Sequence, residues 1–145
     1  MPGTFKFFIK SYGFSYSSNW GEGDAYAVGT YLKSLFDEVC QHRNSTFSNS
    51  DFWWEPNAGD IADHELLVYL VPDQSSSIIR SINSGAGLGP GGTTVFNNNY
   101  SLTEVYFNVG FNLADANPHR GLAVLCFHEL MHNKLKRGNS LHTNG

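Results

Sequence analysis

Hydrophobic and polar residues alternate in the first segment of the chain, Thr4–Ser11 (TFKFFIKS), and this pattern predicts a β-strand. The next stretch, Tyr12–Asp24, is rich in Gly, Ser and Asn and predicts a loop. From Glu22 or Asp24 to about His42, hydrophobic residues recur at spacings of four, which is typical of one face of a helix. We therefore expect the chain to begin with a strand and a long helix.

The middle of the chain contains four segments with the character of strands. They are Asn44–Asn57 with its aromatic group Phe52–Trp54, Glu65–Val71, Thr93–Asn97 and Thr103–Val109. Glu65–Val71 (ELLVYLV) is a continuous apolar run closed by Pro72, which is typical of a central strand covered on both faces. Ser81–Gly92 is expected to be a glycine-rich loop. Its glycines have a GxGxxG spacing, but they lead into a strand rather than a helix, so no dinucleotide site is expected.

A second long helix is predicted near the C-terminal end. Asn117 can cap it and Pro118 suits its first position, while Gly138 is a natural stop after about Lys136. The order strand, helix, strands, helix predicts an α/β (α+β) fold, with a mixed twisted sheet packed by two main helices. No internal boundary divides residues 1–145, so we expect a single domain.

Charge and composition narrow the classes of function. The net charge is −4, with 9 Lys and Arg against 13 Asp and Glu, so no basic surface for nucleic acid is expected. No segment has the length and hydrophobicity of a membrane span. Lys6 and Lys10 interrupt any apolar run near the N-terminus, so we expect no signal peptide there, and secreted and cytoplasmic locations both stay open. Cys40 and Cys126 are expected to be free thiols, with one bridge between them as the alternative.

The second helix carries the candidate chemistry, His128-Glu129-Leu130-Met131-His132. Histidines four residues apart on a helix lie on one face, one turn from each other, so both imidazoles can reach one metal ion. Zinc binds neutral imidazole and keeps an open position for water when the protein supplies three ligands. Glu129 is placed to reach that water and can act as the general base. The motif therefore predicts a zinc-dependent hydrolytic site.

A catalytic zinc site needs a third protein ligand, and His142 is our candidate. Thirteen residues follow His132, and among them His142 has suitable donor chemistry, while Gly138 would let the chain turn back toward the metal. The alternative is that His142 belongs to a mobile tail. His64 is the next candidate. His119 lies more than two helical turns before His128, roughly 13 Å along the axis, so it cannot share the ion.

The His128–His132 motif resembles that of the zincin metallopeptidases, and the order of elements resembles the upper subdomain of the metzincin group. The resemblance implies that His128 and His132 bind zinc and that Glu129 is the catalytic base. Two features depart from the metzincin pattern: the distance to the next histidine, His142, is longer, and no methionine turn follows. We therefore expect either a chain truncated at its C-terminal end or a divergent member of the group.

The same resemblance implies where substrate would bind. In metzincins an edge strand pairs with an extended peptide, which corresponds here to Thr93–Asn97 and gives Thr94, Val95 and Phe96 as substrate-binding residues. The alternative is an ordinary edge strand whose polar residues oppose aggregation. Our leading hypothesis is a zinc metallopeptidase that acts on a peptide or protein substrate. The second hypothesis is a zincin-like, non-catalytic binding or assembly module in which zinc is structural or absent.

Overall fold

The computed structural model describes residues 3–14, 20–42, 47–56, 66–96, 101–111 and 117–135 of the 145-residue chain. The strands in these residues are β1 (Gly3–Ser11), β2 (Phe47–Trp54), β3 (Leu66–Val71), β4 (Gly92–Phe96) and β5 (Ser101–Tyr106). The helices are α1 (Glu22–His42), the 3-10 turn η2 (Gln74–Ser76), α2 (Ile78–Ile82), α3 (Phe107–Phe111) and α4 (Pro118–Leu135). The predicted α+β class is therefore confirmed.

The five strands form one mixed sheet in the order β2-β1-β3-β5-β4. β2, β1, β3 and β5 run parallel to one another, whereas β4 is antiparallel to β5. β3 thus lies at the centre, as its apolar sequence predicts, and β4 forms one edge. The register of β4 on β5 places Thr94 opposite Thr103 and Thr93 opposite Glu104.

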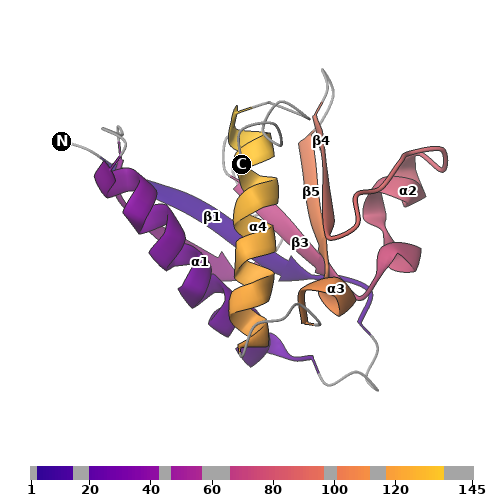
Figure 1. Ribbon diagram of the computed structural model, residues 1–145, viewed down its shortest axis with the longest axis horizontal. Helices are drawn as coiled ribbons and strands as arrows, with labels where there is room; N and C mark the ends of the chain where they lie inside the picture. Colours follow the sequence, from indigo (N-terminus) through magenta and orange to yellow (C-terminus); the bar gives the residue numbers. More distant parts are fainter. Residues whose placement is uncertain are drawn as a thin grey trace.

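Both long helices cover the same face of the sheet and pack against each other (Figure 1). In α1 the fully or nearly fully buried side chains are Ala25, Val28, Leu32 and Phe36. Their spacings of three and four place them on one side of the helix, so burial of this stripe holds α1 on the sheet. The predicted helical periodicity is therefore confirmed.

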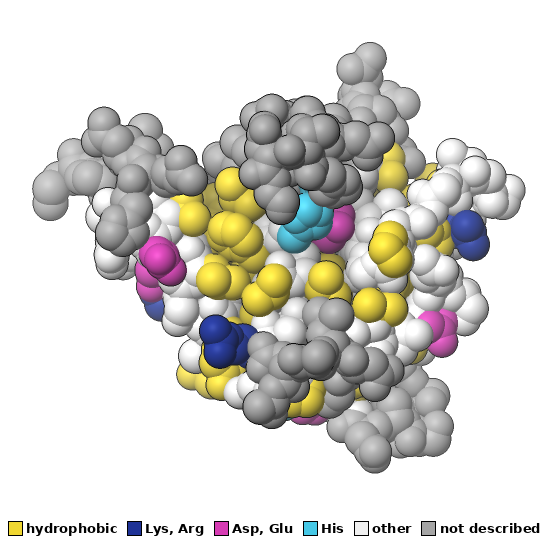
Figure 2. Space-filling view, in the orientation of Figure 1, with side chains coloured by type: hydrophobic (Ala, Val, Ile, Leu, Met, Phe, Trp, Pro, Cys, Tyr) yellow, Lys and Arg dark blue, Asp and Glu magenta, His cyan; other side chains and the backbone are white. Residues whose placement is uncertain are grey.

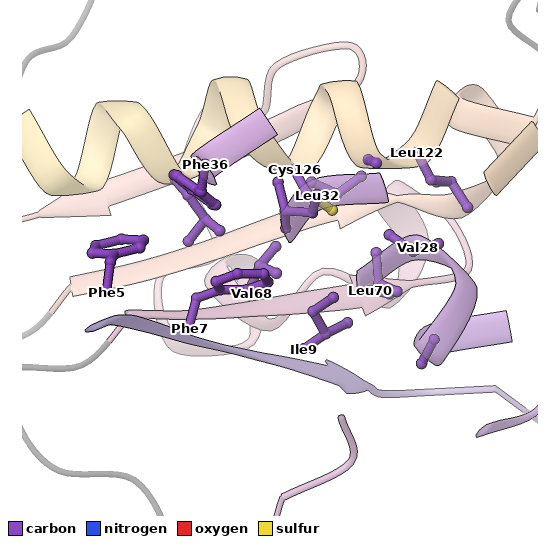
Figure 3. Packing of buried hydrophobic residues seen from close by; sticks show 14 residues of the cluster. Phe5, Phe7, Ile9, Val28, Leu32, Phe36, Val68, Leu70, Leu122 and Cys126 are labelled. Carbon is purple, nitrogen blue, oxygen red and sulfur yellow. The ribbon is translucent and has the colours of Figure 1, made fainter. Parts of the chain in front are cut away.

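The main hydrophobic core lies between these helices and the sheet. β1 directs Phe5, Phe7 and Ile9 toward it, because alternate residues of a strand face the same side. Figure 3 shows side chains from α1 and α4 meeting those of β1 and β3 in this layer. Cys126 of α4 is fully buried in the core and Cys40 of α1 is half-buried, and no disulfide bond joins the two, as expected.

A buried carboxylate organises the opposite face of the sheet. Glu104 of β5 accepts hydrogen bonds from the Ser77 hydroxyl at 2.5 Å and from the Ile78 and Ile79 amides at 2.8 and 3.1 Å. The Tyr106 hydroxyl donates to the same carboxylate at 2.8 Å. Glu104 therefore satisfies the first amides of α2 and ties this short helix to β5.

Two local predictions are wrong. Ser81 and Ile82 belong to α2 rather than to a glycine loop, because Ser77 and Glu104 together cap a helix of five residues. The strand predicted over Thr103–Val109 ends at Tyr106, and α3 begins at Phe107. The Asn108 amide leaves the ladder and donates to the Pro72 carbonyl at 3.0 Å. Among the described residues, no helix has both the length and the hydrophobicity that a membrane span needs.

Candidate metal centre

Helix α4 forms where the sequence supplies a cap and a buried stripe. The Asn117 side chain accepts a hydrogen bond from the Arg120 amide at 3.2 Å, and Pro118 occupies the first helical position, as predicted. One side of the helix buries Leu122, Cys126 and Leu130 completely. This stripe fixes the rotation of α4 about its axis and thereby sets the direction of the side chains of the histidine motif.

His128 and His132 direct their imidazoles toward each other. The two Nε2 atoms lie 3.0 Å apart, and the ring centroids are 4.6 Å apart with the ring planes at 85°. Two nitrogens that each bind a tetrahedral zinc ion at about 2.0–2.1 Å would be separated by about 3.3 Å. The pair therefore has nearly the separation that two ligands of one such ion require.

Glu129 completes a cluster with the two histidines. One ligand atom from each of His128, Glu129 and His132 lies within 4.8 Å of those of the other two. Glu129 and His132 are only 8% and 6% exposed, whereas His128 is half-buried. Figure 2 shows histidine side chains next to an acidic side chain at the centre of the face that carries α4.

The edge strand β4 holds Glu129 from the other side. The Thr94 Oγ1 lies 2.9 Å from the carboxylate oxygen Oε1 of Glu129 and 2.8 Å from its backbone oxygen. The carboxylate therefore has a hydrogen-bond partner within the protein while it stays beside the imidazoles. The contact from β4 therefore restrains the carboxylate beside the two imidazoles.

Cys126, one turn before Leu130, belongs to the core rather than to the metal centre. Its side chain is fully buried, and burial raises the pKa of its thiol, with a further contribution from the negative charge of Glu129. A thiol in this environment stays protonated at neutral pH, whereas the thiolate is the form that binds metal. The cysteine therefore fills space in the hydrophobic core.

The other predicted site residues are placed as follows. His142 and the alternative ligand His64 lie outside the described residues. Val95 follows Thr94 and is half-buried, and Phe96 is the last residue of β4, with a side chain outside the described part. His119 lies at the far end of α4, where its Nε2 is 2.8 Å from Asp24 Oδ1 and links α4 to α1.

Sequence reasoning missed two features of the site. The first is the hydroxyl of Thr94 on Glu129, because Thr94 was predicted from the resemblance only as a substrate-binding residue. The second is Gly92, which faces Cγ and the carboxyl carbon Cδ of Glu129. The Gly92-Thr93-Thr94 sequence at the start of a strand carries no recognisable signal for either contact, since both depend on how the edge strand crosses α4.

Comparison of the chain with protein-family models, curated proteins and solved structures finds no significant match.

Proposed function

We propose that this protein is a zinc metallopeptidase in which His128 and His132 bind the metal and Glu129 is the general base. The observation that carries the proposal is the cluster on α4, where two imidazole nitrogens 3.0 Å apart lie beside a buried carboxylate. Histidine pairs at this spacing on a helix are typical zinc ligands. The resemblance of the motif to that of the zincins, metzincins in particular, supports the same assignment.

The chemistry follows from the donors that the chain supplies. A bound zinc ion would polarise a water molecule and lower its pKa toward neutrality. Glu129 is nearly buried, so its carboxylate is shielded from bulk water and can accept a proton from a group beside the imidazoles. It can then deliver this proton to the leaving amine. His142 is our proposed third ligand.

The position of β4 favours an extended peptide as the substrate. β4 is the last strand in the sheet order, and it contacts Glu129 directly through Thr94. A peptide added to the outer edge of β4 by main-chain hydrogen bonds would therefore run past the base. Thr94, Val95 and Phe96 are the residues of β4 that we propose for this interaction.

The decisive experiment combines metal analysis with one substitution. Protein purified without chelator should contain one zinc per chain and hydrolyse members of a generic peptide library. Glu129→Gln should keep the zinc and reduce hydrolysis by about 100-fold or more, because it removes the base and no histidine. Glu38→Gln, the same change on α1, is the matched control and should leave both properties unchanged.

The outcomes separate the two hypotheses. Metal-free protein that takes up no zinc would refute the metal centre. Protein that binds zinc and cleaves no peptide would instead favour the non-catalytic binding or assembly module. Loss of zinc in Glu129→Gln would show that Glu129 is a ligand rather than the base.

A further inference from the structure

Side chains on the two faces of β4 form hydrogen bonds with different parts of the protein. On the face toward α4, Thr94 contacts the carboxylate and the backbone oxygen of Glu129. On the opposite face, Thr93 Oγ1 lies 2.8 Å from the Tyr106 hydroxyl and accepts a hydrogen bond from the Gly89 amide at 2.9 Å. An edge strand has a neighbour on one side only, so these side-chain bonds add to the constraint that β5 provides.

The tyrosine in this arrangement is itself held by the buried carboxylate of Glu104. Tyr106 is fully buried, and its hydroxyl donates to Glu104 at 2.8 Å while it contacts Thr93. Glu104 in turn accepts bonds from the first amides of α2. The face of β4 away from α4 is thus connected through Thr93 and Tyr106 to the buried carboxylate of Glu104.

The inner face of β4 is shaped around Glu129. A Cβ atom on Gly92 would lie 2.7 Å from Cγ and 3.2 Å from Cδ of Glu129, and 2.9 Å from the backbone oxygen of Glu104. Separations below 3.0 Å are not tolerated, so the missing side chain makes room for the carboxylate. Two residues further along, on the same face of the strand, Thr94 supplies the hydroxyl.

We propose that Thr94 is a positioning residue for Glu129, and that the edge strand sets the orientation of this carboxylate through the open space at Gly92 and the hydroxyl of Thr94. A threonine hydroxyl has one proton to donate, and the two oxygens of Glu129 within 2.9 Å compete for it. Thr103 Oγ1, 3.3 Å from Thr94 Oγ1, lies behind it across the strand pair. The carboxylate is therefore held before any substrate or metal arrives.

This proposal rests on the proposed function in one respect, the consequence for catalysis. Thr94→Val keeps the shape of the side chain and removes the hydroxyl, and should lower kcat for peptide hydrolysis by about 10- to 100-fold, since a misplaced base loses alignment. KM and zinc content should stay unchanged. Thr94→Ser should restore most of the activity. Thr4→Val, the same change on the exposed part of β1, is the matched control.

A double substitution distinguishes positioning from a general effect on stability. If Thr94 acts through Glu129, adding Thr94→Val to Glu129→Gln should cause no further loss of kcat, because the group that it positions is already gone. If the effects of the two substitutions multiply, Thr94 acts in another way and the proposal is overturned. Equal losses in Thr94→Ser and Thr94→Val would also overturn it, since the hydroxyl would then not matter.

A measurement without metal or substrate tests the contact itself. Metal-free protein labelled with carbon-13 at the glutamate carboxyl groups should give a signal that disappears in Glu129→Gln. This signal should shift in Thr94→Val and stay in place in Thr4→Val. Wild-type protein that cleaves no peptide refutes the proposed function, and this signal alone then decides whether Thr94 orients the carboxylate. An unchanged signal in Thr94→Val would refute the positioning role.

Discussion

At the scale of single residues, the side chain of Glu129 differs from those of His128 and His132 in the element that it contacts. The histidines come from one helix and face each other, with 3.0 Å between their Nε2 atoms. Glu129 comes from the same helix, but its carboxylate is bonded to Thr94 on the edge strand. The facing geometry of the two histidines therefore follows from their spacing on α4, whereas the orientation of the proposed base also depends on how α4 and β4 meet. Changes to β4 should accordingly alter turnover before they alter metal affinity.

The first prediction concerns the third ligand. Two histidines leave a zinc ion short of the three protein ligands that a catalytic site uses, and His142 has the right donor chemistry. His142→Ala should weaken zinc affinity by about 100-fold or more, since each ligand contributes strongly to binding. The melting temperature of the metal-free protein should not change. Competition with a chromophoric chelator measures the affinity, and His119→Ala on the same helix as the pair is the control.

Two outcomes would contradict the assignment of His142 as the third ligand. If His142→Ala binds zinc as tightly as the wild type, the third ligand lies elsewhere in the chain, and His64 is the next residue to replace. If His119→Ala also loses zinc, the effect arises from the packing of α4 rather than from coordination.

The candidate site could be predicted from the sequence only where its geometry is local. His128 and His132 are one helical turn apart, so a helix alone brings their nitrogens together, and the structure has them in contact. The hydroxyl of Thr94 lies 35 positions from Glu129 in the chain. No periodicity relates these two residues, and their contact depends on the packing of a helix across a sheet edge. The same holds for Glu104, whose partners in α2 and at its N-cap are 25 to 27 positions away.

At the scale of elements, α1 and β2 are joined by two contacts of different kinds. The ring of Phe52 packs against the backbone of α1 at Gly29, where a Cβ atom would lie 2.2 Å from a ring carbon. About two turns further along α1, Asp37 accepts hydrogen bonds from the Ser50 amide at 2.6 Å and from the Lys33 ammonium at 2.7 Å. Packing and polar bonding together place the edge strand β2 beneath the helix.

We predict that Gly29→Ala destabilises the protein although alanine favours helices. The added methyl group would overlap three carbons of the Phe52 ring, and this ring stacks on Phe7 at a centroid distance of 5.6 Å, so it cannot move freely. We expect a loss of about 1–3 kcal/mol, the range typical of overpacking. Gly23→Ala is the matched control in the same helix, because nothing lies within 4 Å of its Cβ position. Urea unfolding measures both, and an equal stability for the two variants would contradict the assigned contact.

We also predict a pH-dependent contribution from Asp37. Burial acts to raise the pKa of this carboxyl, but the hydrogen bonds from Lys33 and Ser50 outweigh it and hold the pKa below its ordinary value. A lowered pKa in the folded state stabilises the protein above the unfolded pKa of about 3.9, and this contribution is lost as the pH falls through the folded value. Asp37→Asn should therefore cost about 1–2 kcal/mol at pH 7 and nothing in strong acid.

Unfolding curves of Asp37→Asn and wild type, recorded at pH 7 and below pH 3, measure this difference in the free energy of unfolding. Asp51→Asn is the control, because Asp51 is exposed and its carboxylate accepts a hydrogen bond from the neighbouring Phe52 amide. A difference between Asp37→Asn and wild type that persists unchanged below pH 3 would mean that the charge of Asp37 is not what stabilises the contact.

The helices and strands could be predicted from the sequence where the hydrophobic pattern extends over many residues. The two long helices and the strands β1 and β3 follow from periodicity, because each buries a continuous stripe or run. Helices α2 and α3 have five residues each, too few for a periodic pattern. Helix α2 forms because Glu104 accepts hydrogen bonds from its first amides, and α3 forms where the Asn108 amide bonds to Pro72 instead of to a neighbouring strand. These bonds join residues far apart in the chain, so the local sequence does not predict them.

At the scale of the whole molecule, the proposed centre lies in the C-terminal half of a helix that packs on the sheet beside β5 and the antiparallel edge strand β4 (Figure 1). The first half of α4 is anchored to α1 by the pair His119 and Asp24 and by the shared core. The contacts around the first half of α4 thus come from residues other than the proposed metal ligands. Zinc should therefore add stability to a structure that already exists, rather than create it.

The last prediction is that zinc raises the melting temperature of the full chain by a limited amount. A ligand that binds only the native state stabilises it by about 2.7 kcal/mol at a concentration 100 times its dissociation constant. For a chain of 145 residues this corresponds to a rise of roughly 5–10 °C. Chelator should return the protein to its metal-free melting temperature and leave it folded. Magnesium at the same concentration should have no effect, because imidazole nitrogen is a poor ligand for it.

His132→Ala gives the control that connects this shift to the proposed centre. Its side chain is 6% exposed, so the variant should melt somewhat below the wild type without metal, but zinc should no longer raise its melting temperature. A wild-type shift that survives in His132→Ala would place the bound zinc at another site. Unfolding of the wild type on addition of chelator would contradict the view that the core around α4 is sufficient for the fold, and would make the zinc structural.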